Sequence, residues 1–328
     1  MKLLTGKISD IRLPHHSSLA IGMFDGIHLG HKKVLMKCIE KAQFYNLTTA
    51  VLTFLPHPKN IVEPEKKFGR IYSQEYKNKL LEEFKLDYLI IAECNIDLLE
   101  ITADYFVTNI LLGQLKCKSL TTGENFRFGK NRKGDSNLLR RLSKEKDFIY
   151  NVVAVMRKNN SIISSTAIKY ALQLGMMRQV NSFLGRNYIL AGIVLRGRKI
   201  GRKFGFHTAN LMLPTDLSLP LYGVYYVWVT VYVNGCLEKI NAIANIGLRP
   251  TVDTNLQPIL EVHILNFAED IYDQNIAVEF ICFIRPERKF QSIQALQVQI
   301  KRDIANVRFL ISQEKDFTAD VVNNFSRI

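Results

Sequence analysis

The sequence predicts two domains of different fold class: an N-terminal α/β domain built on a parallel sheet, and a small C-terminal antiparallel β-barrel that ends in a helix. The chain has 328 residues, about twice the usual length of one domain. Short apolar runs alternate with helical segments up to about residue 175, whereas strand-like runs separated only by turns begin near residue 186. We place the boundary near residue 180, which gives domains 1–180 and 181–328.

The first domain is predicted from five apolar runs and the helical segments between them. The runs cover residues 19–24, 48–54, 88–92, 119–123 and 148–155. Segments of helical spacing cover residues 31–45, 74–84 and 103–112. This alternation predicts βαβ units and a parallel sheet covered on both faces. Ligands of such a sheet bind at the carboxyl ends of its strands.

The second domain is predicted from six runs that Gly, Pro, Asn and Asp separate. They cover residues 188–195, 208–213, 223–233, 239–247, 259–265 and 277–284. This pattern is typical of a small antiparallel barrel. A terminal helix is predicted over residues 292–314, where apolar residues recur at helical spacing, an arrangement that more often packs on a core than against a partner.

Composition and charge limit the classes of function. Hydrophobic residues at 47% and charged residues at 23% exclude a disordered or collagen-like chain. The 44 basic and 30 acidic residues give a net charge of +14, which favours nucleotides, nucleic acid or a membrane surface as partners. Five scattered cysteines without a CxxC pair fit a reducing, cytoplasmic setting. The sequence shows neither a signal peptide nor an apolar stretch long enough to span a bilayer, so we expect a soluble protein without a membrane partner.

The sharpest local pattern is GMFDGIHLGH at residues 22–31, where the first strand leads into the first helix. Gly26 and Gly30 let the backbone approach a ligand, and the N-terminus of the helix favours a phosphate. His28 and His31 lie three residues apart on the first turn, where both can donate to oxygens that gain charge during phosphoryl or nucleotidyl transfer. A metal site is the alternative, but no HExxH pattern or third ligand lies nearby.

With its GxFDG prefix, this segment resembles the HxGH motif of nucleotidylyltransferases, and in particular the adenylyltransferase module of the prokaryotic bifunctional riboflavin kinase/FAD synthetase family. Residues 53–58 (TFLPHP), 123–129 (GENFRFG) and 164–169 (SSTAIK) resemble three further motifs of that family. The resemblance implies a Rossmann-like domain in which His28 and His31 are catalytic. It also implies nucleotide or flavin contacts at Gly22, Phe24, Asp25, Gly26, Gly30, Phe54, His57, Asn125, Ser164, Ser165, Thr166 and Lys169.

The residues of these motifs can also be interpreted from their own chemistry and position in the sequence. The hydroxyls of residues 164–166 stand at a helix start, where they can cap the helix, hold the β and γ phosphates of ATP, or do both. Lys169 stands where the family has Arg, so a bidentate fork becomes a point charge. His57 lies between two prolines, either displayed at a strand end or part of a plain turn. Phe126 and Phe128 face a flavin ring or belong to the core.

In the second domain, Thr208 and Asn210 follow a basic, glycine-rich loop. The loop has neither the Lys-[Ser/Thr] of a Walker A motif nor a GxGxxG pattern, which excludes both of those phosphate sites. Thr208 and Asn210 lie two apart on a strand and therefore share a face, and their oxygens suit Mg²⁺. Alternatively, they merely begin a half-exposed strand.

The order of motifs in this domain resembles riboflavin kinase. Residues 192–211, 222–225, 244–251, 261–263 and 285–290 carry the resemblance. It implies that Thr208 and Asn210 hold Mg²⁺ and phosphate, that Glu261 is the general base, and that Gly197, Gly201 and Arg202 bind ATP. Glu261 otherwise belongs to an exposed strand face. His207 replaces a Pro of the family, and Asp273 replaces a Gly whose loss strains the turn if φ is positive.

The resemblance predicts a bifunctional enzyme of FAD biosynthesis, which phosphorylates riboflavin to FMN and then adenylylates FMN to FAD, using ATP and Mg²⁺. One alternative is an HxGH nucleotidylyltransferase with another phosphate acceptor. Another is a basic nucleic-acid-binding protein, which we disfavour because the aromatics of residues 223–233 lie in a continuous apolar run typical of buried strands. We therefore expect small-molecule partners and no nucleic acid, and the sequence leaves room for an oligomer.

Overall fold

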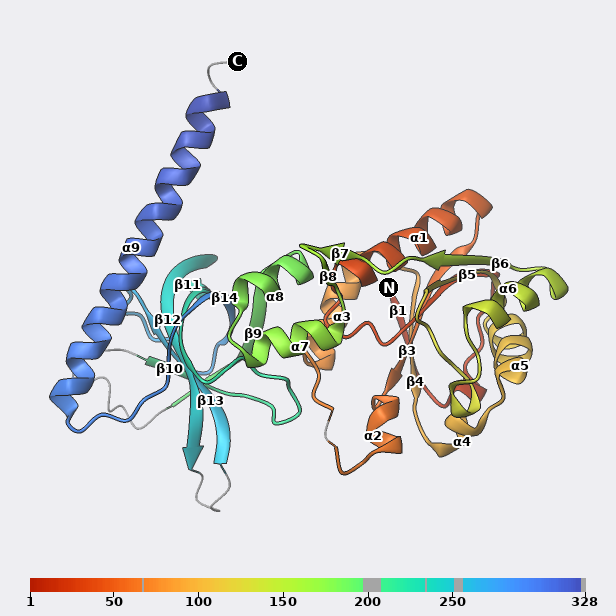
Figure 1. The fold of residues 1–328 in the computed structure, drawn as a ribbon, viewed down its shortest axis with the longest axis horizontal. Helices are drawn as coiled ribbons and strands as arrows, with labels where there is room; N and C mark the ends of the chain where they lie inside the picture. The colour runs from red at the N-terminus through yellow and green to blue at the C-terminus, as the bar shows by residue number, and fades with distance from the viewer. Residues whose placement is uncertain (67, 197–207, 234, 251–255, 326–328) are drawn as a thin grey trace. The chain divides into compact units, whose positions relative to one another are not determined.

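The computed structural model describes residues 1–66, 68–196, 208–233, 235–250 and 256–325, and it divides into two compact units (Figure 1). The first unit comprises Met1–Lys169, Phe183–Gly185 and Asp216–Ser218. The second unit comprises Tyr170–Ser182, Arg186–Thr215 and Leu219–Ile328.

The first unit is built on a six-stranded parallel sheet in the order β1-β4-β3-β2-β5-β6. The strands are β1 (Lys2–Gly6), β2 (Ser17–Ile21), β3 (Thr48–Leu55), β4 (Tyr88–Glu93), β5 (Cys117–Gly123) and β6 (Ile149–Val153). The predicted parallel sheet is confirmed, with one additional strand at its edge. The chain continues from β2 to β3 on one side and later crosses to β5 on the other, so β2 lies at the point where the strand order reverses. Ligands bind at such a point in open α/β sheets.

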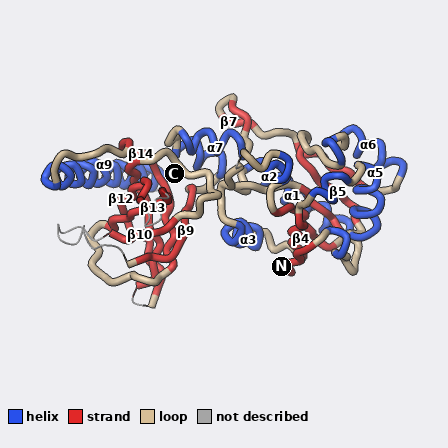
Figure 2. Tube along the Cα trace, turned by 90° about the horizontal axis from the view of Figure 1, so that it is seen from below, coloured by secondary structure: helices blue, strands red, loops and turns tan. Residues whose placement is uncertain are grey.

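Helices pack on both faces of this sheet; Figure 2 shows the strands in red and the helices in blue. The helices from Met1 to Gln173 are α1 (Leu29–Tyr45), α2 (Pro58–Val62), α3 (Gln74–Glu82), α4 (Ile96–Glu100), α5 (Ala103–Tyr105), the π-helical η2 (Phe106–Gln114), α6 (Ser136–Glu145) and α7 (Ser165–Gln173). The same part of the chain contains the short 3₁₀ turns η1 (Ile8–Asp10) and η3 (Lys130–Arg132) and a small hairpin of β7 (Arg157–Lys158) and β8 (Ser161–Ile162). On one face, the hydroxyl of Ser18 on β2 donates to the carbonyl of Cys38 on α1 at 2.8 Å. On the other face, Leu19 and Ile21 form one core with the buried residues of η2 and α6. The neighbouring residues of β2 therefore face opposite layers, as the period of a strand requires.

The second unit contains a closed barrel of six antiparallel strands, which confirms the predicted barrel. The strands are β9 (Tyr188–Leu195), β10 (Thr208–Met212), β11 (Gly223–Val233), β12 (Cys236–Pro250), β13 (Leu256–Ile264) and β14 (Asn275–Pro286), and they close in the order β10-β13-β12-β11-β14-β9. β11 and β12 pair over eleven positions. The ring is completed between β9 and β10, where the paired positions are Leu195 with Asn210 and Val194 with Leu211.

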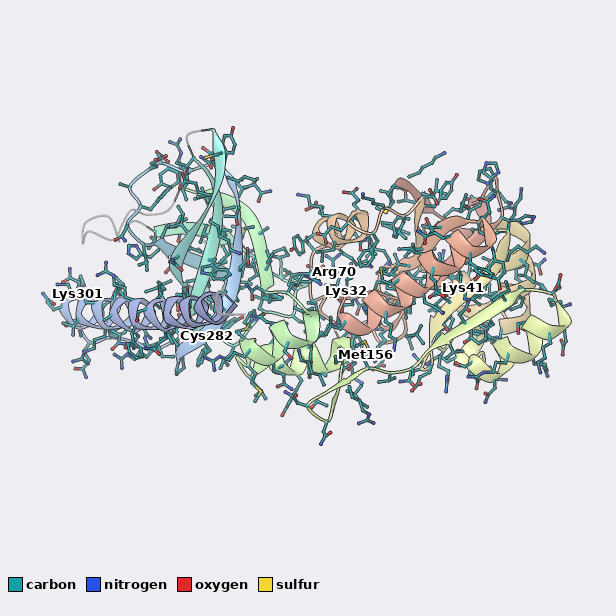
Figure 3. The ribbon with its side chains drawn as sticks, turned by 90° about the horizontal axis from the view of Figure 1, so that it is seen from above. Lys32, Lys41, Arg70, Met156, Cys282 and Lys301 are labelled. Carbon is teal, nitrogen blue, oxygen red and sulfur yellow. The ribbon has the colours of Figure 1, made fainter. Side chains whose placement is uncertain are left out.

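Helix α8 (Met177–Leu184) precedes the barrel, and the long helix α9 (Ile293–Phe325) follows it (Figure 1). The inner face of α9 packs on the barrel through Val307, Ile304 and Leu310, which join a cluster with Val224 and Tyr226. Figure 3 shows α9 with Lys301, an exposed residue, and β14 with Cys282.

A buried polar network also holds α9 to β14. The guanidinium of Arg285 donates to both carboxylate oxygens of Asp303, with Nε at 3.1 and 3.0 Å and a second nitrogen at 2.8 Å from Oδ2. The amide of Gln299 donates to the same carboxylate at 2.6 Å and accepts from Arg288. Asp303 is buried and therefore requires these partners.

Candidate functional site

The first candidate site surrounds the turn between β2 and α1 at the carboxyl end of the sheet. Phe24, Gly26 and Ile27 of this turn have φ values of +48°, +84° and +41°. The side chains of Phe24 and Ile27 are buried. A Cβ at Gly26 would lie 2.8 Å from Cδ1 of Ile71, so both its φ and its surroundings require glycine there. The turn is thus held in a conformation that few other sequences would adopt.

The two predicted histidines lie together at the start of α1. His28 is the N-cap of the helix, and its Nδ1 accepts a hydrogen bond from the backbone N–H of His31 at 3.2 Å. Their rings stack with centroids 3.7 Å apart and planes inclined by 17°. Because Nδ1 of His28 accepts, the neutral imidazole carries its proton on Nε2, which makes that nitrogen a hydrogen-bond donor. His28 can therefore donate from Nε2 at this helix N-terminus, and the role of the pair as donors to a phosphate stays a prediction.

Gly30 is required by this stack. A Cβ at Gly30 would lie 3.1 Å from Cε1 and 3.2 Å from Nδ1 of His28, closer than ordinary van der Waals contact. The same Cβ would lie 4.0 Å from the carbonyl oxygen of Ile163. This distance places the segment that leads into α7 beside the turn of residues 22–28, which we call the histidine turn.

Helix α7 brings the predicted Ser164–Lys169 segment to the same turn. The ammonium of Lys169 lies 2.6 Å from a carboxylate oxygen of Asp25, and both side chains are mostly buried. The hydroxyl of Ser165 donates to the carbonyl of Asp25 at 2.8 Å. The hydroxyl of Ser164 accepts from the N–H of Ala167 at 3.2 Å, so it caps the helix. Capping and an ion pair with Asp25 are the observed roles of this segment.

Four other predicted residues of this unit have surroundings of their own. His57 is the N-cap of α2, with its Nδ1 accepting from the N–H of Lys59 at 3.1 Å. Burial lowers the pKa of His57, and the charge of Lys169 lowers it further, so this imidazole shares the electrostatic environment of the site. Phe54 is half-buried and packs on the core, whereas Asn125 is exposed just beyond β5. Gly22 lies at the start of the histidine turn, where its Cβ would meet the ring of Phe24 at 3.3 Å.

The core, rather than a ligand, accounts for the aromatics of residues 126 and 128. Phe128 is buried in the core of the first unit, and Phe126 packs against that core. Their rings stack with centroids 5.4 Å apart. Thr166, in contrast, is exposed on the first turn of α7, where a ligand can reach it.

Lys77 is a residue of this site that sequence reasoning missed. Its ammonium, buried on α3, donates to the carbonyl of Met23 at 2.9 Å and to Oγ1 of Thr53 at 3.1 Å. One signal was available, because Lys77 lies on the same helix face as the buried Leu80 and Leu81. A lysine on the apolar face of a helix is unusual.

A cavity of about 460 Å³ lies elsewhere in the first unit, at the carboxyl ends of β1 and β4. Its lining includes Lys7, Asn95, Asp97, Thr102 and Tyr105. None of the predicted site residues belongs to its lining. In the sheet, β3 separates β4 from the histidine turn of β2.

The second candidate site lies on the outer face of the barrel. Asn210 on β10 is paired with Glu261 on β13, and Glu261 is paired in turn with Asn245 on β12. Residues opposite one another in antiparallel strands point to the same face, so these three side chains form one row. Thr208 is paired with His263 in the same register. Their neighbours Ala209, Leu211, Leu260 and Val262 are buried in the barrel.

This face of the barrel brings together three predicted residues, Thr208, Asn210 and Glu261, and adds Asn245. Asn210 is buried, and Thr208 and Glu261 are half-buried. A hydroxyl, an amide carbonyl and a carboxylate are hard oxygen donors, which are the ligands that Mg²⁺ prefers, so the residues present fit this ion. Among the residues that the structure describes, no group of three His, Cys, Asp or Glu side chains could hold a metal ion.

Four predicted positions of the barrel, Gly197, Gly201, Arg202 and His207, lie outside the described residues. Asp273, the other departure from the family pattern, has a φ of +65°, which is the left-handed conformation that favours glycine. Its backbone N–H donates to the carbonyl of Val194 at 2.9 Å. The sequence at this turn therefore carries a local strain.

A parallel α/β unit with a histidine pair at a helix N-terminus, joined to a barrel that displays hard oxygen donors, defines a two-domain transferase that acts on phosphates. Two family models match the chain: FAD synthetase over residues 10–167 and riboflavin kinase over residues 184–311. The chain belongs to the family of bifunctional riboflavin kinase/FMN adenylyltransferases, as the similarity to the following relatives also shows.

Curated relatives of that name match nearly the whole chain. The protein of Haemophilus influenzae is 36% identical over 94% of this chain and 98% of its own length. The protein of Escherichia coli K12 is 35% identical over 94% of this chain and 97% of its own length.

A solved structure is similar over the same extent. A crystal structure from Streptococcus pneumoniae, described as a macrolide-efflux protein, has a TM-score of 0.83 and 28% identity, and the match covers 94% of this chain and 99% of that one. Its description differs from those of the curated relatives, and the family assignment rests on the two domain models and those relatives. Within the described residues, none of the helices has the length and apolar character needed to cross a membrane.

Proposed function

We propose that residues 1–180 transfer the adenylyl group of ATP to FMN and that residues 181–328 phosphorylate riboflavin, each reaction at the candidate site of its own unit. The chain is a riboflavin kinase and FMN adenylyltransferase, and its substrates are riboflavin, FMN and ATP. The assignment of each step to named residues is our proposal.

In the kinase step, the 5′-hydroxyl oxygen of riboflavin attacks the γ-phosphorus of ATP. Glu261 accepts the hydroxyl proton, the bond from the γ-phosphorus to the β–γ bridging oxygen breaks, and ADP leaves. Thr208 and Asn210, paired beside Glu261 in the barrel, would hold Mg²⁺ and the phosphates. When bound, this ion neutralises phosphate charge, which is the main requirement of phosphoryl transfer.

In the adenylyl step, a phosphate oxygen of FMN attacks the α-phosphorus of ATP. The bond from the α-phosphorus to the α–β bridging oxygen breaks, and pyrophosphate leaves. His28 and His31 donate hydrogen bonds to the phosphate oxygens as their charge grows. Thr166 and the N-terminus of α7 hold the outer phosphates, and Asp25 fixes the ammonium of Lys169 beside them.

The stacked histidine pair on the first turn of α1 carries the proposal for the first unit. Replacement of His28 by alanine is expected to lower the rate of adenylyl transfer about 100-fold, because one donor to the transition state is lost. The kinase rate is expected to stay unchanged. Riboflavin, ATP and Mg²⁺ are incubated with each variant, and riboflavin, FMN and FAD are separated and quantified.

His15→Ala, which removes an exposed histidine of the same unit, is the matched control and should leave both rates unchanged. Equal losses of both activities in His28→Ala would contradict the assignment of separate sites. A wild-type chain that forms FMN but no FAD, even from supplied FMN, would contradict the adenylyl step itself.

The cytoplasmic location and the absence of a nucleic-acid partner also remain part of this proposal. In this proposal both units bind ATP, and these polyanionic substrates account for the net charge of +14. A binding assay with duplex DNA across a range of salt concentrations distinguishes this explanation from a basic nucleic-acid-binding surface.

A further inference from the structure

Lys77 is a buried cation that the proposed mechanism does not use. It lies on α3 with only 7% of its surface exposed. Its ammonium contacts two oxygens, the carbonyl of Met23 and Oγ1 of Thr53, and the Thr53 hydroxyl donates to the same carbonyl at 3.2 Å. Burial of an ammonium is costly unless its contacts compensate. Here those contacts converge on Met23, the second residue of the histidine turn.

The turn that follows Met23 needs such support. Phe24 and Ile27 both adopt positive φ, and for a β-branched residue such as Ile27 this conformation is a true outlier. Strained backbone persists only where the surrounding structure determines it several times over. A turn that must present His28 and His31 to a ligand therefore depends on what holds it.

Contacts from several other segments hold the turn. The carbonyl of Met23 accepts from Lys77 and from Thr53. The carboxylate of Asp25 accepts from the backbone N–H of Ile71 at 2.9 Å and pairs with Lys169, and the carbonyl of Asp25 accepts from the hydroxyl of Ser165. Two of these contacts come from the segment of Ile71 and Lys77. Residues 71–77 thus hold the histidine turn through hydrogen bonds to Met23 and Asp25.

The charges near Lys77 are those of the site itself. Asp25 on the turn favours its ammonium form, whereas Arg70 just before α3 opposes it. Besides burial, the charge of Lys169 lowers the pKa of His57, Asp25 raises it, and Lys77 lowers it. Figure 3 labels Arg70, together with Lys32 on the first turns of α1.

We propose that Lys77 is a positioning residue of the adenylyl-transfer site: its ammonium fixes the carbonyl of Met23 and thereby the turn from which His28 and His31 reach the nucleotide. This inference rests on the proposed function of the first unit. Lys77 itself touches the turn and Thr53 and acts on the reaction through them.

The position of Lys77 makes adenylyl transfer sensitive to alkaline pH. Burial lowers the pKa of Lys77 from its ordinary value of 10.5 to about 8. Below pH 8 the ammonium form holds the turn through charge-assisted hydrogen bonds, and above pH 8 the neutral amine forms weaker ones. The rate of adenylyl transfer should therefore fall as the pH rises through about 8.

The first test compares Lys77→Met with Lys79→Met, which removes an exposed lysine from the same helix. Displacement of the histidines by as little as about 1 Å is expected to lower kcat of adenylyl transfer about 100-fold, with a smaller change in KM for ATP. Lys79→Met should keep both parameters. Riboflavin phosphorylation in the same sample reports whether the protein is intact, and Lys77→Gln, which keeps a donor, replaces Lys77→Met if that variant loses both activities.

The second test separates positioning from a general structural role. Lys77→Arg keeps its charge at alkaline pH and should retain adenylyl transfer beyond pH 8, whereas the wild type loses it and Lys77→Met shows no fall in that range. Amide hydrogen exchange at Phe24 and Asp25 should be faster in Lys77→Met than in the wild type and unchanged in Lys79→Met.

Two results would overturn the inference: a Lys77→Met protein with wild-type kcat and the same alkaline fall, or unchanged amide exchange at the turn in a variant that has lost adenylyl transfer. A wild-type chain that phosphorylates riboflavin but transfers no adenylyl group would instead contradict the proposed function. The exchange experiment then decides alone whether Lys77 holds the turn.

Discussion

At the scale of single residues, the histidine pair depends on the missing side chain of Gly30 as well as on the two imidazoles. Gly30 leaves the space in which the ring of His28 stacks on His31, because a Cβ there would come within 3.2 Å of two ring atoms. The N-cap hydrogen bond of His28 uses the same ring. A methyl group at residue 30 would therefore disturb both the N-cap hydrogen bond of His28 and its stacking on His31.

We expect Gly30→Ala to lower adenylyl transfer about tenfold or more, because the His28 ring must move away from its position at the helix start. Kinase activity should persist. Gly113→Ala is the control, since its Cβ would lie 3.4 Å from the carbonyl of Thr108, in ordinary contact. Steady-state rates of FAD formation from FMN measure the effect, and wild-type rates in Gly30→Ala would show that the stack is dispensable.

The histidines were predictable from sequence and Lys77 was not, for a physical reason. His28 and His31 belong to one short motif, whose spacing alone places them on one helical turn. Lys77 acts on a backbone carbonyl 54 positions earlier in the chain, and no local pattern encodes that contact. The row of Asn210, Glu261 and Asn245 is intermediate, since each residue was visible in a strand but their alignment depends on the register of three strands.

At the scale of elements, the attachment of α9 to the barrel depends on a buried ion pair. Arg285 and Asp303 make a bidentate contact, and the side chain of Asp303 is only 3% exposed. Loss of one partner leaves the other charge buried and uncompensated, which costs more than the intact pair contributes.

Asp303→Ala is expected to destabilise the second unit by about 3 kcal/mol. Trp228 on β11, the single tryptophan of the chain, reports on this unit in urea unfolding followed by fluorescence. Arg196→Ala removes an exposed pair with Asp273 and should change the stability by less than about 0.5 kcal/mol. Similar midpoints for the two variants would mean that the Arg285–Asp303 pair does not hold the helix.

Strands with strong apolar runs were predictable, and the element at the sheet edge was not. The runs that became β2 to β6 and β9 to β14 consist of residues buried on one or both faces. β1 pairs only with β4 and its five residues are mostly exposed, so it has little apolar pattern to detect. Helix α9 extends to Phe325, beyond the predicted end near residue 314, where the apolar spacing had stopped.

At the scale of the whole molecule, two units with separate sites imply that FMN made by one can be used by the other in a different chain. The row of Asn210, Glu261 and Asn245 lies on the barrel, and the histidine pair lies on the first turn of α1 in the other unit. In the proposed function, each reaction uses its own ATP and its own residues.

A mixture of Glu261→Gln and His28→Ala proteins is expected to convert riboflavin to FAD much faster than either variant by itself. Glu261→Gln alone should leave riboflavin unchanged, and His28→Ala alone should accumulate FMN. The reason is that released FMN diffuses from one protein to the other. Chromatography of the flavins over time measures this. Failure of the mixture, with each variant retaining its remaining activity, would mean that FMN passes between sites without release.

Among the residues that the structure describes, β9 pairs with β10 over two positions, whereas the other neighbouring strands of the barrel pair over five or more. Local opening of a closed sheet starts where the fewest backbone hydrogen bonds must break. Thr208 and Asn210 lie on β10, one of the two strands of this short pairing. A nucleotide bound to β10 would therefore stabilise the pairing, and its binding would raise the free energy of unfolding of the barrel.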